Sequence, residues 1–62
     1  MEREIKNGLG IVMGRISDEG DKKRAYDRSG IYLGYYDKQL DTTYDRFGNV
    51  IGLGEVLVSL IL

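Results

Sequence analysis

The sequence predicts an all-β domain: an antiparallel meander of about six short strands, made of three β-hairpin repeats over residues 1–62. Two similar segments, Tyr26–Gly34 and Tyr44–Gly52, support this prediction, because both follow the pattern Tyr-Asp-x-x-Gly-x-x-x-Gly. Their spacing of 18 residues is about the length of two short strands and two turns. Nine glycines and no proline are typical of a chain rich in tight turns. We expect a small open barrel or a sheet, capped by the apolar C-terminal segment.

The Asp and the first Gly of each repeat predict a hairpin turn. An Asp at the first position of a type I turn caps the turn through its side chain, and a Gly three residues later accepts a positive φ. Three-residue hairpin loops use this arrangement together with a G1 bulge. The expected turn residues are Asp27 with Gly30 and Asp45 with Gly48. This register places Tyr26 opposite Tyr32, Ala25 opposite Leu33, Tyr44 opposite Val50, and Thr43 opposite Ile51.

A degenerate copy of the repeat precedes these two. Asn7 stands where the other copies have Asp, and Gly10 and Gly14 occupy the two glycine positions, although the Tyr is missing. We therefore expect Asn7 and Gly10 to form a third hairpin turn. The expected strands are residues 2–6, 11–16, 22–27, 31–36, 42–45 and 49–53, with polar turns at 17–21 and 37–41.

Neither face of this sheet is expected to be purely polar, so part of the second face must be covered. In the predicted register one face collects Ile5, Ala25, Thr43, Ile11, Ile31, Met13, Leu33, Ile51, Tyr35 and Leu53. The other face collects Val12, Tyr32, Val50, Tyr26, Tyr44, Ile16 and Tyr36, together with the repeat glycines Gly14, Gly34 and Gly52.

The C-terminal segment 55–62 is the obvious cover, because it is apolar except for Glu55 and Ser59. Its periodicity fits a helix or a strand. The two Val residues and one Ile are costly choices in a short helix, which slightly favours a strand. In either form the segment packs over the sheet, pairs with another subunit, or does both.

The composition excludes several kinds of site. The chain has no Cys and no His, which removes disulfides, cysteine-ligated metals, ordinary zinc sites and histidine-based acid–base catalysis. The Gly8–Gly14 stretch lacks the βαβ context of a dinucleotide loop, and the carboxylates around Asp41 lack the calcium-loop spacing. We expect no enzyme activity and no catalytic, cofactor or metal residue. Without an apolar signal segment or a run of about 20 apolar residues, a cytoplasmic protein with no membrane partner is expected.

Self-association is the expected function, most simply as a homodimer, with another protein partner as the other possibility. A chain of 62 residues builds only a marginal core alone, and tyrosines suit interfaces because each offers a large rigid surface with a polar tip. The tyrosines could equally be core residues with exposed hydroxyls. The candidate interface comprises Tyr26, Tyr32, Tyr36, Tyr44, Val56, Leu57, Val58, Leu60, Ile61 and Leu62.

A small nucleic-acid-binding β-barrel is the alternative. Lys22, Lys23 and Arg24 lie beside tyrosines, and basic residues hold phosphates while exposed aromatic rings stack on bases. The same charges could simply protect a strand edge from aggregation. Neighbouring acidic residues and a net charge of −1 disfavour the nucleic-acid interpretation.

The segments YDRSGIYLGYYD and TYDRFGNVIGLG resemble the tandem hairpins of small, functionally uncharacterised bacterial proteins and, more distantly, the YD repeats of large secreted toxin-type proteins. The resemblance covers residues 26–54, about half of the chain. It implies hairpin turns and carries no catalytic residue. This chain has only two or three units, whereas YD-repeat arrays are long, so a shell-forming role is not implied.

Overall fold

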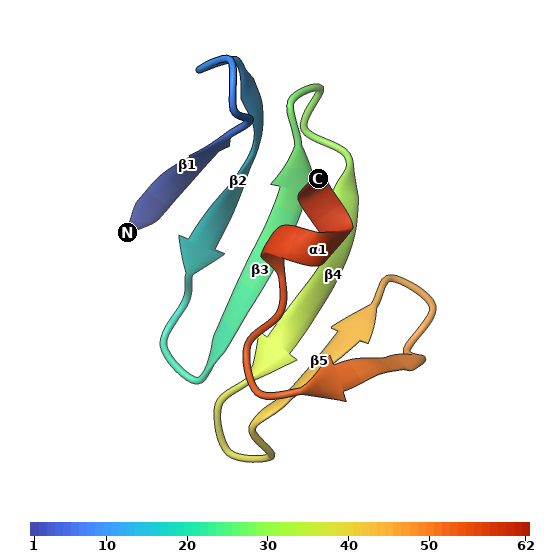
Figure 1. Ribbon diagram of the computed structural model, residues 1–62. Helices are drawn as coiled ribbons and strands as arrows, with labels where there is room; N and C mark the ends of the chain where they lie inside the picture. The colour runs from blue at the N-terminus through green and yellow to red at the C-terminus, as the bar shows by residue number, and fades with distance from the viewer.

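The computed structural model describes residues 1–62 as one six-stranded antiparallel sheet with a single short helix (Figure 1). The strands lie side by side in chain order, which is the predicted meander. The sheet stays open, with the first and last strands as its edges, and does not close into a barrel. The elements are β1 (Glu2–Lys6), β2 (Val12–Asp18), β3 (Lys22–Asp27), β4 (Tyr32–Asp37), β5 (Thr42–Asp45), β6 (Val50–Leu53) and α1 (Val58–Ile61).

The three hairpin turns are built in the same way. In each, the side-chain Oδ1 of the first residue accepts hydrogen bonds of 2.8–3.1 Å from the backbone N–H groups two and four residues later. The glycine three residues on has a φ of +80° to +88°, and its N–H donates to the carbonyl of the first residue at 3.0 Å. The degenerate first copy is therefore a full structural repeat. The turn pairs are Asn7 with Gly10, Asp27 with Gly30, and Asp45 with Gly48.

A β-bulge after each turn changes the register that the sequence predicted. In the second hairpin Tyr26 lies opposite Tyr32 as expected, but Ala25 lies opposite Gly34. The predicted pairing of Ala25 with Leu33 is wrong, because Leu33 is the extra residue of the bulge. The other hairpins repeat this shift: Tyr44 lies opposite Val50 as expected, Thr43 lies opposite Gly52 and not Ile51, and Ile5 lies opposite Gly14.

This shift corrects the predicted faces of the sheet. An extra residue reverses the alternation of side chains beyond it, so the second glycine of each repeat joins the face of its cross-strand partner. The face that we call the inner face carries Ile5, Gly14, Ile16, Ala25, Gly34, Tyr36, Thr43 and Gly52. The opposite face, the outer face, carries Arg15, Arg24, Tyr26, Tyr32, Tyr35 and Tyr44.

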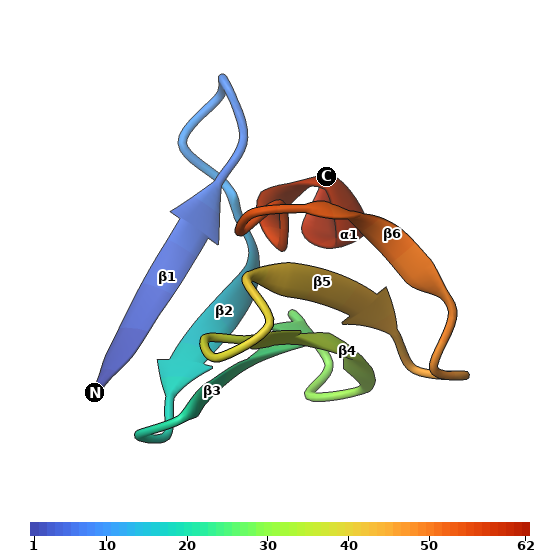
Figure 2. The same ribbon diagram turned by 90° about the horizontal axis from the view of Figure 1, so that it is seen from below.

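The C-terminal segment caps the inner face as a helix, and not as the slightly favoured strand. The sheet curves around α1, which lies across β3 and β4 (Figures 1 and 2). Leu57 is fully buried beneath it, and Ile61 is nearly so. The cost of β-branched residues in one helical turn is outweighed by this burial, since a fully buried aliphatic side chain contributes about 1.5–3 kcal/mol.

The second glycine of each repeat lies against the C-terminal segment, and those at 14 and 34 also lie against the backbone carbonyl of Tyr26 or Tyr44 on the neighbouring strand. A Cβ atom placed on Gly14 would lie 2.9 Å from Ile61 Cγ2, and one placed on Gly34 would lie 2.8 Å from Leu60 Cδ1. On Gly52 it would lie 3.3 Å from Cγ2 of Val56. The C-terminal segment thus packs directly against the second glycine of all three repeats.

The resulting core is small. Its buried apolar side chains come from only five residues, with a second set of half-buried residues packed against them. The structure contains no helix long enough and apolar enough to cross a membrane. The core residues are Ile5, Ile16, Ala25, Leu57 and Ile61, and the half-buried residues are Met13, Leu33, Tyr36, Val58 and Leu60.

Candidate interaction surfaces

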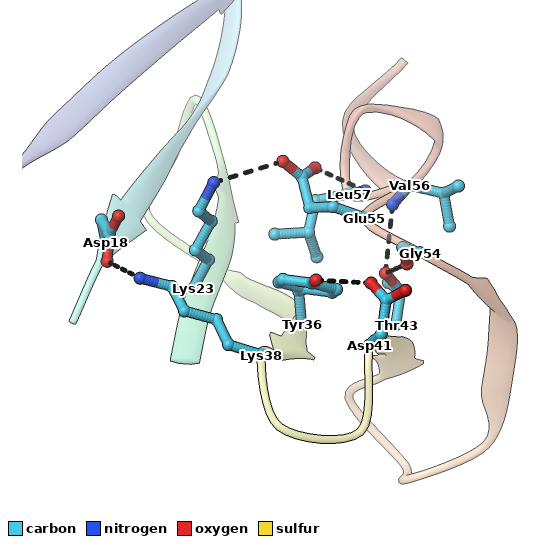
Figure 3. A network of polar contacts seen from close by, with 10 residues as sticks. All are labelled: Asp18, Lys23, Tyr36, Lys38, Asp41, Thr43, Gly54, Glu55, Val56 and Leu57. Carbon is cyan, nitrogen blue, oxygen red and sulfur yellow. Dashed lines mark hydrogen bonds and ion pairs between the residues drawn. The ribbon is translucent and has the colours of Figure 1, made fainter. Parts of the chain in front are cut away.

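A polar network fastens the C-terminal segment to the inner face (Figure 3). The hydroxyl of Thr43, which is fully buried, donates to the carbonyl of Gly54 at 2.7 Å and accepts from the N–H of Val56 at 3.1 Å. Glu55 forms an ion pair of 3.6 Å with Lys23. The chain therefore enters the helix along a defined path, anchored by residues from β3 and β5.

Two further contacts lie beside this network (Figure 3). The hydroxyl of Tyr36 donates to Oδ1 of Asp41 at 2.6 Å, and this hydrogen bond, with partial burial, raises the pKa of Tyr36. Lys38 forms a 2.8 Å ion pair with Asp18, and its hydrogen bond lowers the pKa of the Asp18 carboxyl. Each contact joins the turn between β4 and β5, which contains Lys38 and Asp41, to a strand: Asp18 ends β2, and Tyr36 lies in β4.

The fold buries some of the predicted interface residues of the C-terminal segment and leaves others half-buried or exposed. Leu57 and Ile61 are buried within their own chain and offer no surface to a partner. Leu62 is exposed, whereas the remaining members, Val56, Val58 and Leu60, are half-buried. The segment is therefore mainly a cap for its own sheet.

Four of the five tyrosines gather on the outer face. Tyr26 and Tyr32 form a tilted pair with ring centroids 5.9 Å apart, and Tyr35 and Tyr44 form a stacked pair at 4.9 Å. Tyr36 was expected with them but lies on the inner face, because the bulge reverses the alternation of β4. Tyr35 takes its place. All four rings are half-buried against their neighbours.

Basic side chains line the same tyrosines. The guanidinium of Arg15 lies 4.6 Å from the ring centroid of Tyr26, and Lys22 Nζ lies 5.6 Å from that of Tyr35. Arg24 bonds to Glu19, and that hydrogen bond raises its pKa. Burial raises the pKa of Tyr32 on the same face.

The predicted basic run does not form one surface. Lys22 and Arg24 lie on the outer face, whereas Lys23 lies on the inner face and pairs with Glu55. Alternation along a strand causes this division. Arg15 also lies on the outer face, although the sequence analysis did not select it as a candidate residue.

A set of exposed apolar side chains on the last strand and on the turn before it was also not predicted. It consists of Phe47, Val50, Ile51 and Leu53, with exposed fractions of 75%, 61%, 41% and 82%, and we call it the edge patch. The available signal was the absence of charge from Val50 to Leu53 in the last predicted strand. The opposite edge, β1, is charged at four of its five residues.

A hollow of about 370 Å³ is lined by Met1, Glu2, Arg3, Ile16, Asp18 and Lys23, so charges of both signs surround it. No cluster of His, Cys, Asp or Glu is arranged to hold a metal ion. Every buried side-chain nitrogen and oxygen has a hydrogen-bond partner.

No protein-family model, curated protein or solved structure matches this chain.

Proposed function

We propose that this chain is a non-enzymatic interaction module that self-associates, most simply as a homodimer. The observation that carries the proposal is the edge patch, a set of exposed apolar side chains on and beside an open edge strand that itself carries no charge, with the guanidinium of Arg46 over the ring of Phe47. Exposed apolar side chains at an unpaired strand edge are a site for pairing with another chain.

The size of the core supports self-association. Five buried apolar side chains are few for a 62-residue chain, and small domains need a further source of stability. The chain has no cysteine for a disulfide, so burial of the edge patch against another molecule is the simplest remaining source.

The side-chain inventory supports a non-enzymatic role. The chain lacks His and Cys, and the one hydroxyl that bonds to a carboxylate is that of Tyr36, on Asp41. This pair lies beside an exposed turn and does not line the hollow. Its arrangement serves to hold the turn in place.

Sedimentation equilibrium over a range of concentrations tests the proposal. The expected result is a weight-average mass that rises with concentration from the 7.0 kDa of one chain towards twice that value. A mass that stays at 7.0 kDa up to the highest soluble concentration would overturn the proposal.

Nucleic-acid binding is a second candidate, supported by the three cations and four tyrosine rings of the outer face. A salt titration of binding to a fluorescent single-stranded oligonucleotide tests it. Neutralising phosphates releases counterions, so the affinity must fall steeply as salt rises. Absence of binding at low salt would remove this candidate.

A further inference from the structure

We propose that the self-association occurs edge to edge, with β6 of one copy paired antiparallel to β6 of a second copy about a two-fold axis. The two sheets would then form one continuous sheet of twice the width. This inference rests on the proposed function and assigns it to one surface, the edge patch of Phe47, Val50, Ile51 and Leu53.

The backbone of β6 has free hydrogen-bonding groups on its outer side. Asn49 accepts from the N–H of Asp45 at 2.8 Å, and the N–H of Gly54 donates to Asp41 at 2.7 Å. In an antiparallel ladder the direction of these groups alternates from residue to residue, and the bulge at Ile51 adds one residue that faces β5. The N–H and C=O groups of Val50, next to Asn49, and of Leu53, next to Gly54, therefore point away from β5, on the side of β6 that has no neighbouring strand. Figure 2 shows β6 at this edge of the sheet.

The side chains of β6 leave this edge unprotected. The strand Val50–Leu53 carries no charge, no proline and only one glycine, and its apolar side chains are exposed. Natural sheets protect their edges with charged residues, as β1 does here with Glu2, Arg3, Glu4 and Lys6. Of the two edges, β6 is therefore the one without charged side chains, although it is only four residues long and carries the bulge at Ile51.

A second copy of the chain fits this edge in a two-fold arrangement. A two-fold interface brings the same surface of both molecules together, so the patch must be complementary to itself. Two uncharged apolar strands meet this condition. Pairing of β6 with β1 of another molecule would instead desolvate Glu2 or Glu4 beside apolar side chains and would build an open filament.

The pairing leaves the rest of the fold intact. Helix α1 contacts β2, β3 and β4, and its burial does not depend on the free side of β6. The network of Thr43 also remains inside the chain. Dimerisation therefore needs no rearrangement of the C-terminal segment.

Charge substitution on the edge tests this inference. The double variant Val50→Lys/Leu53→Lys places like charges on both copies, which disfavours strand pairing, at side chains that are already exposed. The matched control is Leu9→Lys/Ile31→Lys, which adds the same charge at exposed apolar residues next to the other two turns. In sedimentation equilibrium we expect the edge variant to raise the dimer dissociation constant about tenfold or more and the control to leave it near the wild-type value.

A charge-complementation experiment separates lost pairing from lost folding. The variant Val50→Glu/Leu53→Glu should also be monomeric alone, and an equimolar mixture with the Lys variant should restore a dimer. A misfolded variant could not give this rescue. Persistence of the dimer in the Lys variant, its equal loss in the control, or a mixture that stays monomeric would overturn the edge inference while self-association stands. A monomeric wild type would overturn both proposals.

Discussion

Substitution of Gly14 by Ala tests whether this position must lack a side chain, because both the backbone of β3 and the C-terminal helix lie against it. The new Cβ would overlap the carbonyl oxygen of Tyr26 and lie 2.9 Å from Ile61 Cγ2. Adding a methyl group to a filled space lowers the free energy of unfolding by about 1–3 kcal/mol. We expect a cost near the upper end of this range at Gly14, because the obstacle is a backbone atom that cannot easily move. Replacing Gly by Ala also stabilises the fold by about 0.4–1 kcal/mol, because it reduces the conformational entropy of the unfolded chain. The net expected loss is about 2 kcal/mol.

That loss is large for this chain. At about 0.05–0.15 kcal/mol per residue, 62 residues give a total stability of roughly 3–9 kcal/mol. The expected fall in melting temperature is about 8–16 °C for a domain of this size. Urea unfolding at fixed protein concentration measures the loss as a lower transition midpoint.

Two glycines provide matched controls for the same substitution. Gly8 has no positive φ and nothing within 4 Å of its added Cβ, so Gly8→Ala should be neutral or slightly stabilising. At Gly52 the nearest atom is Cγ2 of Val56, 3.3 Å away on a side chain that can shift, so the cost should stay below about 1 kcal/mol. Equal stability of the Gly14→Ala and Gly8→Ala variants would refute the reasoning.

Three further changes probe other parts of the fold. Thr43→Val removes the buried hydroxyl that bonds to Gly54 and should lower the free energy of unfolding by about 1–3 kcal/mol; an unchanged urea midpoint would contradict the anchoring role. A hydrogen bond from the backbone N–H of Asn49 lowers the pKa of the Asp45 carboxyl below 3.8 in the folded protein. The ionised carboxylate of Asp45 therefore stabilises the fold above pH 3.8, and this stabilisation is lost as the pH falls through the lowered pKa of the folded protein. Asp45→Asn should keep the turn and reduce the fall of the urea unfolding midpoint at acid pH. If the midpoint of this variant falls with pH as much as that of the wild type, the Asp45 carboxylate is not a cause of the acid dependence. Deletion of residues 55–62 uncovers the inner face and should give an unfolded or aggregating chain by circular dichroism and light scattering; a folded, soluble monomer would show that the cap is dispensable.

The meander and its turns could be predicted because their causes are local. The Asp or Asn at each turn and the Gly three residues later determine hydrogen bonds within five residues of chain. Even the degenerate copy at Asn7 follows the same rule. Short-range chemistry of this kind is readable without any tertiary contact.

The bulges at Met13, Leu33 and Ile51, which lie beyond the G1 bulges expected at the turns, were not predicted from the sequence. The bulges place the glycines at 14, 34 and 52 on the face that the C-terminal segment covers. A regular ladder would place these glycines on the opposite face of the sheet. The same one-residue shift moved Tyr36 to the inner face and left Tyr35 on the outer one. The helical form of the C-terminal segment is a product of tertiary packing, which overrides the preferences of Val and Ile.

The edge patch illustrates a signal that was present but was not used. The last strand, Val50–Leu53, lacks any charge, and the meander order makes it an edge. Sequence reasoning instead assigned the interface to the tyrosines and the C-terminal segment. The structure buries Leu57 and Ile61 of that segment and leaves the edge exposed.

Residue-resolved hydrogen–deuterium exchange at low and high protein concentration tests the central claim most directly. If two copies pair through β6, the amide protons of Val50 and Leu53 exchange more slowly as the concentration rises, while the edge amides of β1 keep the same rate. Exchange rates at Val50 and Leu53 that do not depend on concentration, or protection that appears at β1 instead, would contradict the account.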